Sequence, residues 1–210
     1  MPERPDAADV ALPVVSGIVL AGGRSSRFGD DDKLRAELRG RPLFHHAVHA
    51  LASVCDEVIV VLAAGKARTP SLPSDVRVPV RVVRDRIAGA GPLAGLAAGL
   101  AASDAELVLV AGGDQPDLAP ALLQLLTGSV READAAVLAE GERPRPIPAV
   151  VRRARALELA LARLRTDQRS LRALIAELDP VVVPERTWRR VDPDGAWRRD
   201  VDVPGDLPSG

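Results

Sequence analysis

The sequence is poor in several residue types, and each scarcity narrows the possible functions. A single cysteine among 210 residues excludes an intramolecular disulfide and a cysteine-based zinc site, and it fits a reducing cytoplasm. Lysine and arginine number 28 against 29 acidic residues, so the basic excess of a general nucleic-acid binder is missing. No apolar run approaches the ~18 residues of a transmembrane helix. We therefore expect a cytoplasmic protein that binds neither nucleic acid nor membrane.

Aromatic residues are scarce as well, at 2% with no tyrosine, so the core must consist mainly of Ala, Leu and Val. Hydrophobic residues at 47% and charged residues at 27% are the balance of a globular protein. The first 13 residues are polar and proline-containing and lack the pattern of a signal peptide, so we expect a loose lead-in. No linker long enough to divide the remainder is present. Residues 14–210 are thus expected to form a single domain.

Short apolar runs alternate with segments of helical periodicity, which indicates an α/β fold with a mostly parallel sheet covered on both faces. The expected strands are residues 14–21, 57–63, 80–83, 106–111 and 133–139, and the expected helices are 42–54, 92–102 and 118–126. Beyond these we expect a turn-rich segment at 141–148, a strand at 148–151, helices at about 153–164 and 170–178, a strand at 180–184 and a turn at 191–195.

A glycine-rich loop with several cations follows the first expected strand. Gly22 and Gly23 allow backbone N–H groups to approach phosphate oxygens, and Arg27 and Lys33 add positive charge for an anionic ligand. Lys33 is notable because the sequence has only two lysines. The loop is not a Walker A motif. The alternative is a solvated surface loop, which would not require this combination after a core strand.

Two further loops carry candidate residues. Around Gly91 the spacing Gly-x-Gly-x-x-x-Gly leads into a helix, whose N-terminus can hold a phosphate, although a flexible loop fits equally well. Asp114 follows the fourth strand, where a carboxylate commonly holds Mg²⁺ with a substrate phosphate; the alternative is a turn or capping residue. Asp117 is expected to cap the next helix. Asp202 would supply a second carboxylate.

The order of these motifs resembles that of the MobA-like nucleotidyltransferases, most of all the molybdenum cofactor guanylyltransferases. The motifs are Leu-Ala-Gly-Gly-x-Ser-x-Arg-Phe-Gly-x3-Lys, Gly-Pro-Leu-Ala-Gly, Gly-Asp-Gln-Pro and Asp-Val-Asp-x-Pro-x-Asp-Leu, and they span residues 16–207. The fold implied is a three-layer α/β sandwich with a Rossmann-like, mostly parallel central sheet, similar to nucleotide-diphospho-sugar transferases.

The resemblance also implies residue roles. It implies nucleotide contacts, the first three through backbone groups, at Leu20, Ala21, Gly22, Gly23, Arg27, Lys33, Asp85, Gly91 and Asp114. Arg27, Lys33 and Asp114 are the implied catalytic residues, and Asp114 and Asp202 the implied Mg²⁺ ligands. Residues 61–64, Val-Leu-Ala-Ala, depart from the family because its side-chain amide at the end of the second strand is missing.

The reaction implied is transfer of GMP from GTP to the phosphate of molybdopterin, the molybdenum cofactor precursor, with release of pyrophosphate. A phosphate monoester is already an anion at neutral pH, so the absence of a Ser–His–Asp arrangement is no objection. The departure at residues 61–64 leaves open CTP, or another phosphorylated acceptor. A non-catalytic nucleotide-binding module is the alternative from another class. The sequence carries no sign of the oligomeric state.

Other candidate residues have simpler interpretations. His45 and His49 are spaced i, i+4, but no H-E-x-x-H pattern is present, so a partly buried polar helix face is expected. Cys55 is expected to be a small buried hydrophobe. The arginines between Arg152 and Arg172 are expected to lie mostly on a solvated face. The run from Arg143 to Pro148 is the preferred candidate for contacting an anionic acceptor.

Overall fold

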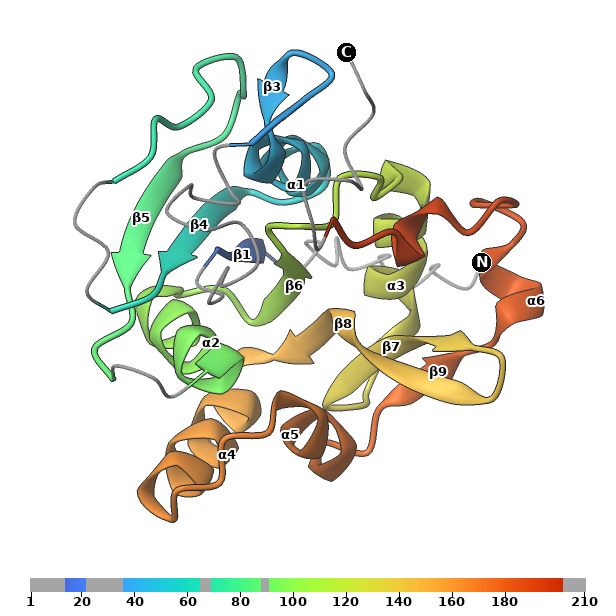
Figure 1. Cartoon of the computed structure of the whole chain (residues 1–210). Helices are drawn as coiled ribbons and strands as arrows, with labels where there is room; N and C mark the ends of the chain where they lie inside the picture. Colours follow the sequence, from blue (N-terminus) through green and yellow to red (C-terminus); the bar gives the residue numbers. More distant parts are fainter. Residues whose placement is uncertain (1–13, 22–35, 65–68, 88–90, 202–210) are drawn as a thin grey trace, which may run out of the picture.

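The computed structural model describes residues 14–21, 36–64, 69–87 and 91–201, and a seven-stranded sheet forms its centre (Figure 1). The strand order is β5-β4-β1-β6-β8-β7-β9. The strands are β1 (Val15–Leu20), β4 (Glu57–Leu62), β5 (Val80–Arg84), β6 (Leu107–Gly112), β7 (Ala135–Glu140), β8 (Arg143–Arg152) and β9 (Val181–Val183). A separate two-stranded ribbon pairs β2 (Glu37–Leu38) with β3 (Arg41–Pro42).

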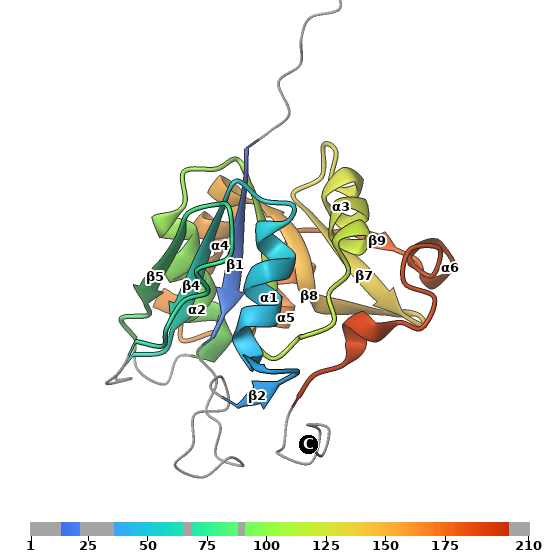
Figure 2. The same ribbon diagram turned by 90° about the horizontal axis from the view of Figure 1, so that it is seen from above.

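Helices cover both faces of the sheet, which confirms the expected three layers. One core holds apolar residues of α1 (Leu43–Ala52) and α3 (Pro120–Ser129). The opposite core holds those of α2 (Gly91–Ala102), α4 (Arg153–Arg165) and α5 (Leu171–Glu177). Strand residues alternate between the two: Val58, Val60 and Leu62 of β4 face the first core, and Ile59 and Val61 face the second. Figure 2 shows the two helical layers on either side of the strands.

The sheet is parallel apart from β8, which pairs antiparallel with both β6 and β7. The turn-rich segment expected at 141–148 is wrong, because most of it is the first half of β8. A tight turn containing Gly141, at φ +58°, joins β7 to β8 directly. The sequence indicated a turn here because three prolines, which are uncommon inside strands, occur at positions 144, 146 and 148. The ladder accommodates them with a register shift between Val137 and Ala139.

The C-terminal third contains elements that the sequence did not predict. A short helix, α6 (Glu185–Trp188), and a 3₁₀ turn, η2 (Ala196–Arg198), follow β9. The two tryptophans, Trp188 and Trp197, are fully buried there and pack edge to face, with ring centroids 5.6 Å apart. In the described part of the chain, no helix combines the length and apolarity needed to cross a membrane.

Candidate active site

The end of β1 lies between the ends of two neighbouring parallel strands. The Leu20 carbonyl oxygen accepts a hydrogen bond from the Gly113 N–H at 3.0 Å, and the Ala21 N–H donates to the Val61 carbonyl at 2.8 Å. These bonds align the carboxyl ends of β1, β4 and β6 at one edge of the sheet. Ligands bind at this edge in parallel α/β sheets, as we expected for the loops that follow these strands.

Helix α2 packs on a face of the sheet beside this edge, and Gly99 allows its backbone to approach the strands closely. A Cβ atom at Gly99 would lie 2.7 Å from Ile18 Cδ1, whereas a Cβ atom at Gly95, one turn nearer the helix N-terminus, would make an ordinary contact at 3.6 Å. Gly91, the exposed first residue of α2, has φ +73°, a conformation that favours glycine. The predicted phosphate-binding role of this helix N-terminus remains a prediction.

Asp85 follows β5 and is buried, with 8% of its surface exposed. Its Oδ1 accepts a hydrogen bond from the Ile87 N–H at 2.7 Å, which is an Asx turn. Its own N–H donates to the Leu62 carbonyl at 2.9 Å. Asp85 therefore fixes the first residues after β5, and a direct nucleotide contact from this side chain stays a prediction.

Asp114 lies half-buried directly after β6 and folds back onto the strand end. A Cβ atom built on Gly112 would lie 2.5 Å from Asp114 Oδ1, so only glycine leaves this space for the carboxylate. The next side chain, Gln115, is 1% exposed, and its Oε1 accepts from the Gly112 N–H at 2.9 Å. Gln115 Nε2 is buried without a hydrogen-bond partner in the described residues. Sequence analysis missed Gln115, whose signal was its place within Gly-Asp-Gln-Pro.

The C-terminal segment returns to this loop. The Val201 N–H donates to the Asp114 carbonyl oxygen at 3.0 Å. The Val201 side chain is fully buried in a small cluster with Leu38 and Leu43. Figure 2 shows β2 and the chain leading to Val201 at the edge to which the β1 arrow points. A backbone hydrogen bond thus joins the Gly-Asp-Gln-Pro motif, which contains Asp114, to the start of the Asp-Val-Asp motif, which contains Val201.

The capping role expected for Asp117 is wrong. The N-cap of α3 is Ala119, with no side-chain capping bond, and Pro120 begins the helix. The Asp117 carboxylate instead pairs with two arginines, Arg39 at 2.7 Å and Arg199 at 3.3 Å. Electrostatic attraction to two guanidinium groups therefore takes the place of the cap. Neither arginine was a candidate in the sequence, because nothing local indicates that both approach this loop.

Several predicted residues lie outside the described part of the chain, namely Gly22, Gly23, Arg27, Lys33 and Asp202. Among the residues that are described, no group of three or more His, Cys, Asp or Glu side chains is placed to hold a metal ion. The donor set nevertheless fits Mg²⁺, which prefers one or two carboxylates together with phosphate oxygens. Asp114 offers a carboxylate at the sheet edge, and Asp202 follows Val201 in the sequence.

The three histidines are half-buried, as expected, and each has a hydrogen-bond or ion-pair partner. His45 Nε2 lies 2.8 Å from the Ser71 carbonyl oxygen, and His46 Nε2 lies 2.8 Å from that of Leu38. His49 lies 3.0 Å from Asp75. Cys55 is buried as expected, and loss of hydration on burial raises the pKa of its thiol to about 12.

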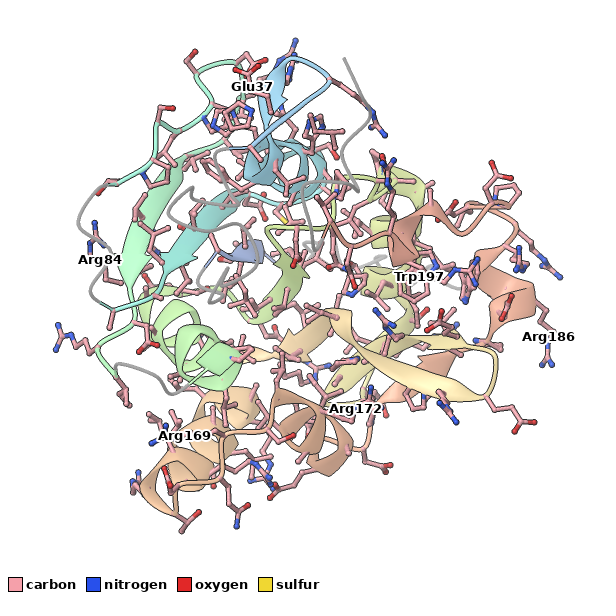
Figure 3. The ribbon with its side chains drawn as sticks, viewed as in Figure 1. Glu37, Arg84, Arg169, Arg172, Arg186 and Trp197 are labelled. Carbon is pink, nitrogen blue, oxygen red and sulfur yellow. The ribbon has the colours of Figure 1, made fainter. Side chains whose placement is uncertain are left out.

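The arginines of the second half lie in two different settings. Arg169 and Arg172 are exposed beside α4 and α5, as expected for this run, whereas Arg152, Arg153 and Arg163 are half-buried (Figure 3). Arg145 of β8 is half-buried and pairs with Glu140 at 3.1 Å and Asp200 at 3.2 Å. The acceptor contact predicted for this run remains a prediction.

Comparisons with known proteins agree with this arrangement. The model of the MobA-like NTP transferase domain matches residues 17–181. A probable molybdenum cofactor guanylyltransferase of Chloroflexus aggregans is 35% identical over 204 residues, or 92% of each chain. The molybdenum cofactor guanylyltransferase of Yersinia pestis strain Pestoides F is 33% identical over 158 residues, 75% of this chain and 78% of its own.

Solved structures share the fold at lower identity. Molybdopterin-guanine dinucleotide biosynthesis protein A from Archaeoglobus fulgidus superposes with a TM-score of 0.73 at 22% identity, covering 91% of this chain and 94% of its own. The 2-C-methyl-D-erythritol 4-phosphate cytidylyltransferase of Thermus thermophilus gives a TM-score of 0.66 at 19% identity, covering 93% of this chain and 96% of its own. At these identities the likeness establishes the fold alone.

Proposed function

Because the chain belongs to the MobA-like NTP transferase family and is a nucleotidyltransferase, we propose that it transfers GMP from GTP to the phosphate of molybdopterin. Pyrophosphate is the second product. The proposal is supported by the names of relatives at 33–35% identity. One structural observation carries the proposal. The end of β1, the loop between β6 and α3 (the Asp114 loop) and the segment that ends at Val201 meet at one edge of the sheet, where the Val201 N–H donates to the Asp114 carbonyl oxygen.

The chemistry asks for alignment and charge stabilisation. An oxygen of the acceptor phosphate attacks the α-phosphorus of GTP. The bond between the α-phosphorus and the oxygen that bridges it to the β-phosphorus breaks, and pyrophosphate leaves. The attacking oxygen is already anionic at neutral pH, so this chain needs no general base. Lys33 and Arg27 are proposed to bind the triphosphate oxygens, where fixed cations stabilise the charge that develops on the leaving group.

Mg²⁺ is the proposed cofactor, and Asp114 is its proposed ligand with Asp202. When bound, Mg²⁺ supplies positive charge to the phosphate oxygens and orients them. The contribution of the chain is to hold the two carboxylates. Gly112 leaves space for the Asp114 carboxylate, and the Val201 N–H fixes the Asp114 backbone to the segment that precedes Asp202.

CTP is the second candidate nucleotide, and one structural observation supports it as an alternative. β4 ends at Leu62, and the half-buried Ala63 and Ala64 that follow offer no side-chain amide to a base. Base selection would then depend on backbone groups at the end of β1. The structure of the nucleotide-binding loop between residues 22 and 35 lies outside the described residues.

The decisive experiment measures pyrophosphate release from each of the four nucleoside triphosphates, with and without molybdopterin and Mg²⁺. We expect release that requires GTP, the acceptor and the metal together. Pyrophosphate release with CTP in place of GTP would identify the protein as a cytidylyltransferase. Pyrophosphate release that does not depend on molybdopterin would contradict molybdopterin as the acceptor. Asp114→Asn should weaken the Mg²⁺ response, because an amide is a poorer ligand for a hard dication.

A matched control for that variant is Asp179→Asn. Asp179 is exposed at φ +46°, a conformation that asparagine adopts as readily as aspartate. It should therefore keep both stability and activity. If Asp114→Asn behaves like this control, Asp114 is a turn residue and the metal site is misplaced.

A further inference from the structure

One carboxylate joins three segments that are distant in the sequence. The Asp117 side chain, only 13% exposed, lies in the loop between β6 and α3. Its Oδ1 lies 2.7 Å from Arg39 Nη2, and its Oδ2 lies 3.3 Å from Arg199 Nη1. Each carboxylate oxygen therefore binds a guanidinium group from a different segment, one before α1 and one near residue 200.

The two arginines belong to segments that also touch one another. Arg39 lies in the turn between β2 and β3, next to Leu38, and Arg199 lies two residues before Val201. Leu38 and Val201 pack together in the apolar cluster described above. Ionic and apolar contacts thus bring the same two segments to the Asp114 loop, where the Val201 backbone adds its hydrogen bond.

The residue between Arg199 and Val201 is held from the other side. Asp200 pairs with Arg145 of β8 at 3.2 Å, and Arg145 is itself bound to Glu140 at 3.1 Å. Three successive residues therefore have different partners. Arg199 pairs with Asp117, Asp200 pairs with Arg145 of β8, and Val201 packs in the apolar cluster. An extended chain points successive side chains in opposite directions, so this alternation fixes both its position and its rotation.

The energetics favour a role in geometry over one in stability. Arg39 and Arg199 are 52% and 41% exposed, and ion pairs with such solvated partners contribute little to the free energy of unfolding. A carboxylate that is mostly buried between two arginines still sets where both can lie. Removing its charge should therefore move the attached segments more than it destabilises the fold.

We propose that Asp117 is a positioning residue for the transfer reaction. It holds the turn after β2 and residues 199–201 against the loop that carries Asp114, and so sets the distance between the carboxylate of Asp114 and the segment that leads to Asp202. The proposal rests on the proposed function, because the metal site between these segments belongs to it. Asp117 acts through these segments rather than on the substrate or the metal.

The test compares Asp117→Asn with the parent protein and with the matched control Asp179→Asn. The first measurement is hydrogen exchange of the peptide containing Val201 in the ligand-free protein, where Asp117→Asn should exchange faster. The second is the Mg²⁺ concentration for half-maximal pyrophosphate release. We expect it to rise about tenfold, the usual scale for losing a group that orients a metal ligand, while the rate at saturating Mg²⁺ stays near that of the parent.

Further variants separate position from folding. Asp117→Glu keeps the charge and should restore much of the Mg²⁺ response. Arg199→Met should reproduce the faster exchange at Val201, whereas Arg39→Met should affect it less, because Arg39 belongs to the other segment. A general loss of rate with an unchanged Mg²⁺ midpoint would identify Asp117 as merely structural and overturn the proposal.

The failure of the proposed function would look different. If the parent released no pyrophosphate from any nucleoside triphosphate, the proposed reaction would fall while hydrogen exchange still tested the contacts of Asp117. Unchanged exchange at Val201 in Asp117→Asn would then overturn the positioning role independently of any activity.

Discussion

Ser16 and Ser103, 87 residues apart, share a buried hydrogen bond in which the Ser103 hydroxyl donates to the Ser16 hydroxyl over 2.8 Å. The Ser16 hydroxyl in turn donates to Glu57 Oε1 at 2.7 Å, and Arg81 donates to Glu57 Oε2 at 3.0 Å. The chain of donors ends on the Glu57 carboxylate, and each of its oxygens accepts one of these bonds. This network fixes the edge of the sheet opposite to the candidate site.

The Glu57 network predicts a pH dependence of stability. Burial by itself would raise the pKa of Glu57, but the hydrogen bonds from Arg81 and Ser16 outweigh it and lower the pKa below the ordinary 4.5. A lowered folded-state pKa adds stability above the unfolded value, and that stability is lost as the pH falls through the folded value. Glu57→Gln should therefore unfold at a lower temperature than the parent at neutral pH. The melting temperatures of the two proteins should become equal below about pH 4.5. A difference in melting temperature that does not change with pH would contradict this role of Glu57.

Gly99→Ala should destabilise the fold. A Cβ atom there would lie 2.7 Å from Ile18 Cδ1 and 3.1 Å from Val61 Cγ2, so α2 must shift away from the sheet. We expect a loss of about 1–3 kcal/mol in the free energy of unfolding, the usual cost of overpacking a core. Denaturant titration measures it.

The control for this change is Gly128→Ala, another helical glycine, whose Cβ would meet nothing within 4 Å. Alanine should stabilise α3 there by about 0.5–1 kcal/mol, because glycine is the weaker helix former. Equal effects at the two positions would show that helix propensity, not the approach of α2 to β1, decides the outcome.

Gly112→Ala should impair activity more than stability. The new methyl group would meet Asp114 Oδ1 at 2.5 Å, and a side chain at the end of a strand moves more easily than a packed core. We expect the Mg²⁺ midpoint for pyrophosphate release to rise while the melting temperature changes little. If activity fell only in proportion to stability, the position of the Asp114 carboxylate would be unimportant.

Lys33→Ala should lower turnover by about 10²-fold if Lys33 stabilises charge on the triphosphate, since that is the usual effect of removing one such group. The rate at saturating GTP is the quantity to measure. Arg155→Ala provides a cation control, because Arg155 is exposed on α4 and pairs with Glu158 at 3.0 Å. A Lys33 variant as active as this control would contradict the phosphate role.

The sequence predicted the regular half of the fold well because continuous apolar runs such as those of β4 and β6 have few alternatives to buried strands. It failed at β8, where prolines suggested a turn but the strand tolerates them beside a register shift. It also failed at Asp117. A local pattern of a carboxylate near a helix start indicates a cap, whereas the arginines that bind it come from residues 39 and 199. Contacts between distant segments leave no local signal.

The candidate site shows the same division. The places of Asp114 and of the end of β1 at the sheet edge were predictable because their motifs are short and follow strands directly. The ion pair between Arg145 and Asp200 was not, because it depends on the return of the chain near Val201 to the loop after β6. Such a return is a property of the folded topology, so it cannot be read from spacing along the chain.

The tryptophan pair gives this protein an optical reporter in a useful place. With no tyrosine in the chain, near-ultraviolet emission comes almost wholly from Trp188 and Trp197. Both are fully buried, and Trp197 lies four residues before Val201, close to the segment bound to the Asp114 loop (Figure 3). Intrinsic fluorescence therefore follows the packing of the C-terminal third without an added label, and stopped-flow mixing with nucleotide would record its rearrangement in real time.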